Sequence, residues 1–241
     1  MPRVLVVEHE ATCPPALFGS WLEDAGCEMV VCRPYVGDPL PTLEEYDALL
    51  VLGGSMAATD THAWLAPLRD LVRDAAAAEV PTLGICLGHQ VCAVAFGGTA
   101  EPNPRGQQLG LLDIGWTAEA AADPLLGPLS TPRRAVQWND DLVIRLPDAA
   151  VTLAVTPDSE VQAARFAPTV WGVQWHPEVD RAVLEVWAHD DEERHAAAGI
   201  DQERLLADIG DAHAELERSW RPLAEGLAAL AGVPASGVSR K

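Results

Sequence analysis

The first hundred residues alternate continuously apolar runs with segments in which apolar residues recur every three or four positions. The runs that we expect to form strands are 3–7, 28–33, 47–54 and 81–85. The segments that we expect to form helices are 14–26, about 64–75 and the stretch after residue 86. Uniformly apolar strands that alternate with helices are typical of a parallel sheet covered on both faces, so the pattern predicts an α/β fold.

The second half has a different pattern. Short β-like runs separated by Pro, Gly and Asp are expected to form a meander packed on the sheet, at 109–114, 134–137, 142–145, 151–155, 161–166 and 169–175. From about residue 181 the pattern is helical and acidic, with helical spacing throughout 201–230. We therefore expect one domain over 1–187 and a helical C-terminal extension over 188–241. The extension would pack on the same domain and end in a frayed tail, PASGVSRK.

Composition narrows the classes of partner and compartment. The chain has 241 residues, 49% of them hydrophobic, which is enough for a substantial core. A formal net charge of -20 argues against nucleic acid and anionic membranes as partners. No apolar run approaches the roughly 20 residues of a membrane helix, and the N-terminus resembles a strand rather than a signal peptide. We therefore expect a cytoplasmic protein with free thiols.

One cysteine has an unusual setting, in the stretch TLGICLGHQ (82–90). Cys86 lies between Gly84 and Gly88, where an expected strand passes into an expected helix. Small neighbours permit the strained turn of a nucleophile elbow, and the amides at a helix N-terminus favour a thiolate. The other cysteines are expected to be small buried hydrophobic residues: Cys13, Cys27, Cys32 and Cys92.

A thiol nucleophile needs a base, and GVQWHPEV (172–179) offers one. His176 and Glu178 are two positions apart, so in an extended segment both side chains point the same way. Glu178 could then orient the ring while its other nitrogen faces the sulfur. Taken alone, such a pair is also typical of an ordinary surface contact.

The reaction also needs donors for an oxyanion. The amide of Leu87 directly follows the expected nucleophile, and Gly53 and Gly54 end the expected strand 47–54. Glycines let a backbone approach a ligand closely, and Gly54 is the favoured second donor. The alternative is a simple turn from strand to loop.

Together LGGS, GICLGHQ and GVQWHPEV, in that order, resemble a class I glutamine amidotransferase domain over roughly residues 1–180. The resemblance is strongest to the glutaminase half of GMP synthase. It implies a three-layer, mostly parallel, flavodoxin-like sheet flanked by helices, and chemistry that uses no metal or cofactor. It also implies a catalytic triad and a substrate-binding set, namely Cys86, His176 and Glu178, and Gly53, Gly54, Leu87 and Gln90.

Three departures from the family pattern concern the surroundings of the site. The family usually has Gly-Gly-Pro where this chain has Ser55 after the glycines. In WNDD, Asn139 and Asp141 stand where relatives carry the His and Asp of Ser-His-x-Asp. Gln108 stands where many relatives have Glu. None of these residues is carried over to the expected site.

Three functions remain open. The first is a glutaminase that passes ammonia to a separate synthetase, since the chain has no P-loop and no pyrophosphatase loop. The second is a free-standing hydrolase of small γ-glutamyl amides or peptides. The third is a regulatory module without catalysis, which the intact Cys86, His176 and Glu178 argue against. We expect HDDEERH (189–195) to be a solvated acidic segment rather than a metal site. Trp187 and Trp220 are expected to belong to the core of the extension.

Overall fold

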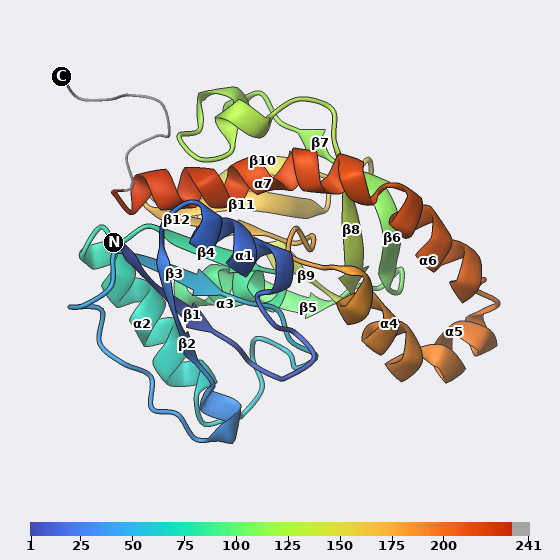
Figure 1. The fold of residues 1–241 in the computed structure, drawn as a ribbon, viewed down its shortest axis with the longest axis horizontal. Coiled ribbons are helices and arrows are strands. Elements are labelled where there is room, and N and C mark those ends of the chain that lie inside the picture. The colour runs from blue at the N-terminus through green and yellow to red at the C-terminus, as the bar shows by residue number, and fades with distance from the viewer. Residues whose placement is uncertain (233–241) are drawn as a thin grey trace.

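A computed structural model describes residues 1–232, and the expected frayed tail lies outside them. Its centre is an eight-stranded sheet in the order β2-β1-β3-β4-β12-β11-β10-β7 (Figure 1). The pairs from β2 to β12 are parallel and those from β12 to β7 are antiparallel. The strands are β1 Arg3–Val7, β2 Glu28–Cys32, β3 Ala48–Val51, β4 Thr82–Ile85, β5 Thr99–Pro102, β6 Gln108–Asp113, β7 Gly115–Trp116, β8 Arg134–Asn139, β9 Asp141–Arg145, β10 Val151–Val155, β11 Val161–Ala167 and β12 Val170–Val173. The helices are α1 Ala16–Asp24, α2 Leu65–Ala77, α3 Leu87–Ala95, α4 Arg181–Asp190, α5 Glu192–Ala198, α6 Gln202–Asp211 and α7 His213–Leu230.

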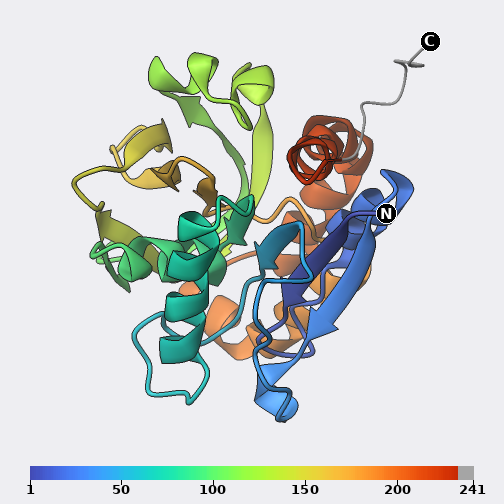
Figure 2. The ribbon, with the colours of Figure 1, turned by 90° about the vertical axis from the view of Figure 1, so that its left-hand side faces the viewer.

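Helices cover both faces of this sheet. Along β1, Val4 and Val6 pack in one buried cluster with residues of α1 and α7. Leu5 and Val7 point the other way, into a second cluster with α2 and α3. Figure 2 shows α7 on the side of the strands away from α2. The expected three-layer α/β architecture with a mostly parallel sheet is therefore confirmed, and burial on both faces explains the uniformly apolar runs.

The expected meander was wrong in its arrangement. The strands β10, β11 and β12 do not pack on the sheet but extend it, through antiparallel pairs. The remaining strands form two separate two-stranded ribbons, β5 with β9 and β6 with β8 (Figure 1). The β5 and β7 strands were not expected from the sequence. The physical reason is that an alternating pattern locates a strand but does not select its partner.

The C-terminal helices continue the main core. The helical pattern of 201–230 is divided into α6 and α7, which meet at Ala212. Trp220 of α7 lies in the sheet's core, with its ring 4.9 Å from that of Trp175. The expected boundary at residue 187 falls within α4, and the domain division stays a prediction. In residues 1–232, no helix combines the length and the apolar character needed to cross a membrane.

Candidate active site

Cys86 lies on a strained turn between β4 and α3. Its backbone has φ 51° and ψ −106°, a conformation that side-chain-bearing residues rarely adopt. The two neighbouring glycines have no room for a side chain. A Cβ on Gly84 would lie 2.3 Å from the Gly88 carbonyl oxygen, and one on Gly88 would lie 2.1 Å from the Val51 carbonyl oxygen. The close passage of α3 over β3 and β4 therefore explains the glycine spacing of this stretch.

The structure brings His176 and Glu178 together next to this turn. Nδ1 of His176 lies 2.7 Å from a Glu178 carboxylate oxygen, and the two residues are only 4% and 2% exposed. The His176 amide donates to the Val136 carbonyl of β8, and the ring lies edge-on to Trp187 at 4.6 Å. With Nδ1 turned to Glu178, the other ring nitrogen, Nε2, has no hydrogen-bond partner within residues 1–232.

Gly53 lies where the side chains of His176 and Cys86 approach each other. A Cβ placed on Gly53 would lie 3.2 Å from Cε1 of His176 and 3.6 Å from Cβ of Cys86. The side chains of Cys86 and His176 thus approach the same point just after β3. A side chain on residue 53 would crowd the His176 ring and touch Cys86, so glycine is the residue that fits best here.

The surroundings of His176 raise its pKa to about 10. Burial is the largest single influence and lowers the pKa, but the neighbouring side chains of Glu178 and Cys86 together raise it more. A histidine that is protonated at neutral pH can give a proton to a leaving group, and it favours a thiolate beside it.

We expect this raised pKa to make stability depend on pH. The pKa of His176 in the folded state, about 10, lies above its ordinary value of 6.5, so the gain in stability is complete below about pH 6.5. It is lost as the pH rises through about 10. In Glu178→Gln, the largest influence that raises the pKa is removed, so this loss of stability should become smaller. The test is the free energy of unfolding of both proteins, measured with urea from pH 6 to pH 10. If this free energy depends on pH equally in both, the pH dependence does not come from the His176–Glu178 pair.

A buried glutamine contacts the sulfur directly. Nε2 of Gln174 donates to Sγ of Cys86 at 3.5 Å, and Gln90 donates to the Gln174 side-chain oxygen at 3.3 Å. Gln90 also donates to the Asp141 carbonyl at 3.0 Å, so it ties α3 to β9. Gln174 was missed in the sequence, although it precedes His176 by two positions and therefore shares its side of an extended segment.

The loop after β3 is held by a carboxylate. One oxygen of Glu10 accepts from the Ser55 amide at 2.7 Å, and the other accepts from the Ser55 hydroxyl at 2.7 Å. Cys13 also donates to Glu10, at 3.3 Å. Gly54 packs against the Leu87 side chain, because an added Cβ would lie 2.9 Å from it. The serine that departs from the family pattern thus supplies an amide hydrogen that a proline would lack.

A cavity of about 330 Å³ lies beside Cys86 and His176. Of the expected site residues, Gly54, Cys86, Gln90 and His176 line it. The rest of its wall comes largely from β8, the β8–β9 turn and the end of α4, and none of it was part of the expected site. Those lining residues include Gln107, Trp138, Asn139, Asp140, Asp141, Trp187, Asp190 and Asp191.

The solvated character expected for 189–195 was wrong for two of its residues. His195 is 1% exposed and lies between the side chains of Gln107 and Gln202. Asp191 accepts from the Trp138 indole at 2.9 Å and from Gln107 at 3.2 Å. The turn between α4 and α5 docks on the β6–β8 ribbon, so its polar side chains are satisfied by that ribbon rather than by solvent.

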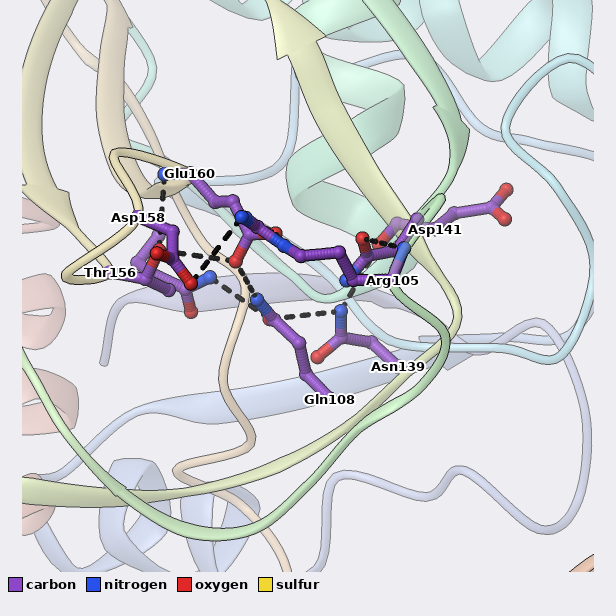
Figure 3. Close-up of polar contacts among 9 residues, drawn as sticks. Arg105, Gln108, Asn139, Asp141, Thr156, Asp158 and Glu160 are labelled. Carbon is purple, nitrogen blue, oxygen red and sulfur yellow. Dashed lines mark hydrogen bonds and ion pairs between the residues drawn. The ribbon is translucent and has the colours of Figure 1, made fainter. Parts of the chain in front are cut away.

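The departures at Asn139 and Gln108 belong to one hydrogen-bonded network beside the cavity (Figure 3). Asn139 donates to Gln108 at 3.3 Å and to the Asp141 carbonyl at 3.2 Å. Gln108 in turn donates to Glu160, which also accepts from Arg105. Neutral amides at both positions let this network continue from the cavity wall to the Arg105–Glu160 ion pair without a buried, uncompensated charge.

The family model of the glutamine amidotransferase class-I domain matches residues 21–185. The chain belongs to the class I glutamine amidotransferase family. One subunit of the glutamine-hydrolyzing GMP synthase from Halobacterium salinarum is 34% identical over 55% of this chain and 67% of its own length. Gamma-glutamyl peptidase 4 from Arabidopsis thaliana is 30% identical over 59% of this chain, and the match covers 57% of the peptidase.

Solved structures agree with this membership at the level of fold. A glutamine amidotransferase from Thermotoga maritima superimposes with a TM-score of 0.84 at 23% identity, over 94% of this chain and 98% of that one. The superposition extends through the C-terminal helices as well as the sheet, because so little of either chain is left out. This amidotransferase therefore shares its fold with nearly the whole chain.

Proposed function

We propose that this chain hydrolyses the side-chain amide of glutamine with Cys86 as nucleophile, His176 as acid and base, and Glu178 as its orienting partner. One observation carries the proposal. A cysteine on a strained elbow shares a cavity with a buried histidine, whose far nitrogen is held by a carboxylate at 2.7 Å. A nucleophile, a base and an orienter in this relation are the requirements of thiol-dependent amide hydrolysis.

The proposed reaction proceeds through a thioester. The Cys86 sulfur attacks the amide carbon, and the backbone amides of Gly54 and Leu87 donate to the oxygen that becomes negative. Protonated His176 gives its proton to the departing nitrogen, so ammonia leaves and a γ-glutamyl thioester remains. The same histidine then takes a proton from water as the hydroxyl adds to the thioester carbon, and cleavage of the C–S bond releases glutamate and restores the thiolate beside protonated His176. Gln174, which donates to the sulfur, would hold it in line for the attack.

We propose a separate synthetase as the user of the ammonia. Relatives of this chain include proteins named as single subunits of a glutamine-hydrolyzing GMP synthase, a name that implies a further subunit. The sequence itself has no P-loop and no pyrophosphatase loop with which to activate an acceptor.

A second candidate function is hydrolysis of larger γ-glutamyl amides. A relative named gamma-glutamyl peptidase matches this chain about as strongly as the synthase subunits do. The cavity also extends past Cys86 and His176 to Trp138, Trp187 and the end of α4. That wall offers contacts to a leaving amine, which ammonia is too small to use.

The test is to trap the thioester. We expect purified protein to release ammonia and glutamate from glutamine in equal amounts. With hydroxylamine present, γ-glutamyl hydroxamate should replace part of the glutamate, because a stronger nucleophile than water intercepts the thioester. Cys86→Ala is the control and should form neither product. Absence of turnover with glutamine and with γ-glutamyl amides would favour the non-catalytic module instead.

A further inference from the structure

The two glycines after β3 are the part of the candidate site with the greatest freedom of rotation. Gly53 and Gly54 carry no side chain, so their peptide planes can turn at little steric cost. In the proposed reaction, the Gly54 amide must point at the oxygen that becomes negative, at about 2.7–3.1 Å. A half-turn of this peptide would direct a carbonyl oxygen there instead, and that oxygen would repel the negative charge. The direction of the amide must therefore be fixed from outside the two glycines.

The strand side of the glycines is well anchored. The Leu52 amide donates to the Val7 carbonyl at 3.0 Å, and the Leu52 carbonyl accepts from the Gly88 amide at 3.1 Å. Gly54 is also closely packed, because an added Cβ would lie 2.7 Å from Sδ of Met56. The chain is thus fixed up to residue 52, and the loop side needs an anchor of its own.

Glu10 supplies the anchor on the loop side. Its two carboxylate oxygens accept from the amide and from the hydroxyl of Ser55, each at 2.7 Å. Hydrogen bonds to a carboxylate are shorter and stronger than those between neutral groups. Two such bonds to one residue fix the position of Ser55 and the rotation of the peptide that precedes it. Gly53 and Gly54 are therefore confined between Leu52 and Ser55.

Glu10 is itself held by a short turn. The Cys13 amide donates to the Glu10 carbonyl at 3.2 Å, and the Cys13 thiol donates to the Glu10 carboxylate at 3.3 Å. Within residues 1–232, the carboxylate is bonded only to Cys13 and Ser55, and it makes no ion pair. It lines the cavity, yet its hydrogen bonds go to the loops and not to a cation.

Of the two neighbouring amides, one is occupied and one is free. The Ser55 amide donates to Glu10, whereas no hydrogen bond among the described residues uses the Gly54 amide as donor. An unpaired amide at a cavity wall is available to a ligand that accepts a hydrogen bond. This arrangement leaves the Gly54 amide for the oxyanion.

We propose that Glu10 is a positioning residue, which holds Ser55 and so keeps the Gly54 amide directed at the oxyanion. This inference rests on the proposed thiol chemistry and adds a residue to it. Glu10 exchanges no proton and forms no covalent bond in the reaction. Its effect is therefore on the rate of the chemical step and not on the binding of glutamine.

Replacing Glu10 with alanine tests the role. We expect kcat for glutamine to fall roughly 10–100-fold in Glu10→Ala while KM changes less than about threefold, because the oxyanion exists only in the reaction. Glu10→Gln keeps an oxygen for the Ser55 amide, and its nitrogen can donate to the Ser55 hydroxyl. This variant should therefore stay within about threefold of the wild type. An equal loss in both variants, or a raised KM with an unchanged kcat, would overturn the positioning role.

Glu8→Ala is the matched control. Glu8 lies two positions earlier, is 3% exposed, and accepts from Arg33 at 2.8 Å and from Tyr35 at 2.9 Å. Its loss should lower stability but leave kcat unchanged, because none of these bonds reaches the loop 53–55. A fall in kcat as large as that of Glu10→Ala would show that any disturbance at the end of β1 suffices, and would overturn the assignment.

Ser55→Ala tests the same contact from the other side with a smaller change. It removes the hydroxyl bond and keeps the amide bond, so kcat should fall by roughly threefold. In the Glu10→Ala background the same substitution should have no further effect, because the acceptor of that bond is already gone. Full additivity of the two substitutions would show that they act independently and would overturn the proposal.

Reactivity of the thiol separates positioning from activation of the nucleophile. Methyl methanethiosulfonate modifies thiols and has no carbonyl group, so its reaction with Cys86 does not use the oxyanion donors. We expect Glu10→Ala to react as fast as the wild type, measured by mass spectrometry of the Cys86 peptide, because His176 and Glu178 remain. Modification slowed in parallel with kcat would assign the effect to the thiol and overturn the inference.

The outcomes also separate this inference from the function on which it rests. An unchanged kcat in Glu10→Ala, with a wild type that hydrolyses glutamine through Cys86, would overturn the inference alone. Absence of turnover in the wild type with glutamine and with γ-glutamyl amides would overturn the proposed function, and the inference with it.

Discussion

Replacing Cys86 with alanine is expected to lower the release of ammonia from glutamine by about 10⁴-fold or more. Without the sulfur no thioester can form, and removal of the nucleophile from such a triad leaves only the small effects of binding and of the oxyanion donors. The fold should persist, because the Cβ and the backbone of the elbow remain. Steady-state ammonia release, with circular dichroism as the check on folding, measures both. A loss of less than about tenfold would exclude Cys86 as nucleophile.

Replacing the same residue with glycine separates activity from strain. Alanine and glycine both lack the sulfur, but only glycine adopts φ 51° without steric cost. We expect Cys86→Gly to be inactive and yet about 1 kcal/mol more stable to unfolding than Cys86→Ala. Equal stability of the two variants would show that the elbow stores no strain.

Gly88→Ala is expected to destabilise the fold by roughly 3 kcal/mol or more. The added Cβ would lie 2.1 Å from the Val51 carbonyl oxygen and 2.8 Å from the carbonyl carbon. Both are backbone atoms of β3, so no side chain can move aside and α3 must shift as a whole. Thermal unfolding should show a decrease in Tm on the order of 10 °C for a chain of this size.

Gly210→Ala is the matched control. Gly210 lies within α6, and an added Cβ there would meet no atom within 4 Å. Alanine is the better helix former, so this variant should gain roughly 0.5–1 kcal/mol. If Gly88→Ala were as stable as the wild type, the close packing of α3 on β3 would be contradicted.

The sequence predicted those elements of the fold that have a hydrophobic pattern within a short stretch of residues. β1 was expected at 3–7 and forms at Arg3–Val7, because burial on both faces makes a strand uniformly apolar. β7 has two residues, Gly115 and Trp116, which are too few to show a pattern. The pairing of β11 with β12 depends on contacts between whole strands. No short stretch of sequence encodes such pairing, so the expected meander was misplaced.

The candidate site, too, was predictable only where short stretches of sequence carry a signal. Cys86 was singled out by glycines two positions away on each side, and His176 with Glu178 by their spacing of two. Both signals are a few residues long. Trp187 and Asp191 carry no such signal, because each resembles an ordinary residue of an acidic helix. They reach the cavity only because α4 folds back against the β6–β8 ribbon. The catalytic roles of the expected residues remain predictions until the variants are measured.

The parallel pairing of β4 with β12 has a consequence for how this protein is made. The Cys86 amide donates to the Val173 carbonyl at 2.9 Å, and Gln174 reaches the sulfur across 88 positions of sequence. Contacts of such separation form late in folding, because the intervening chain must first be ordered. During synthesis, Cys86 emerges well before His176, because it lies much earlier in the chain. The proposed hydrolysis of glutamine requires both halves of the sheet to have joined, so we expect it only from the folded molecule.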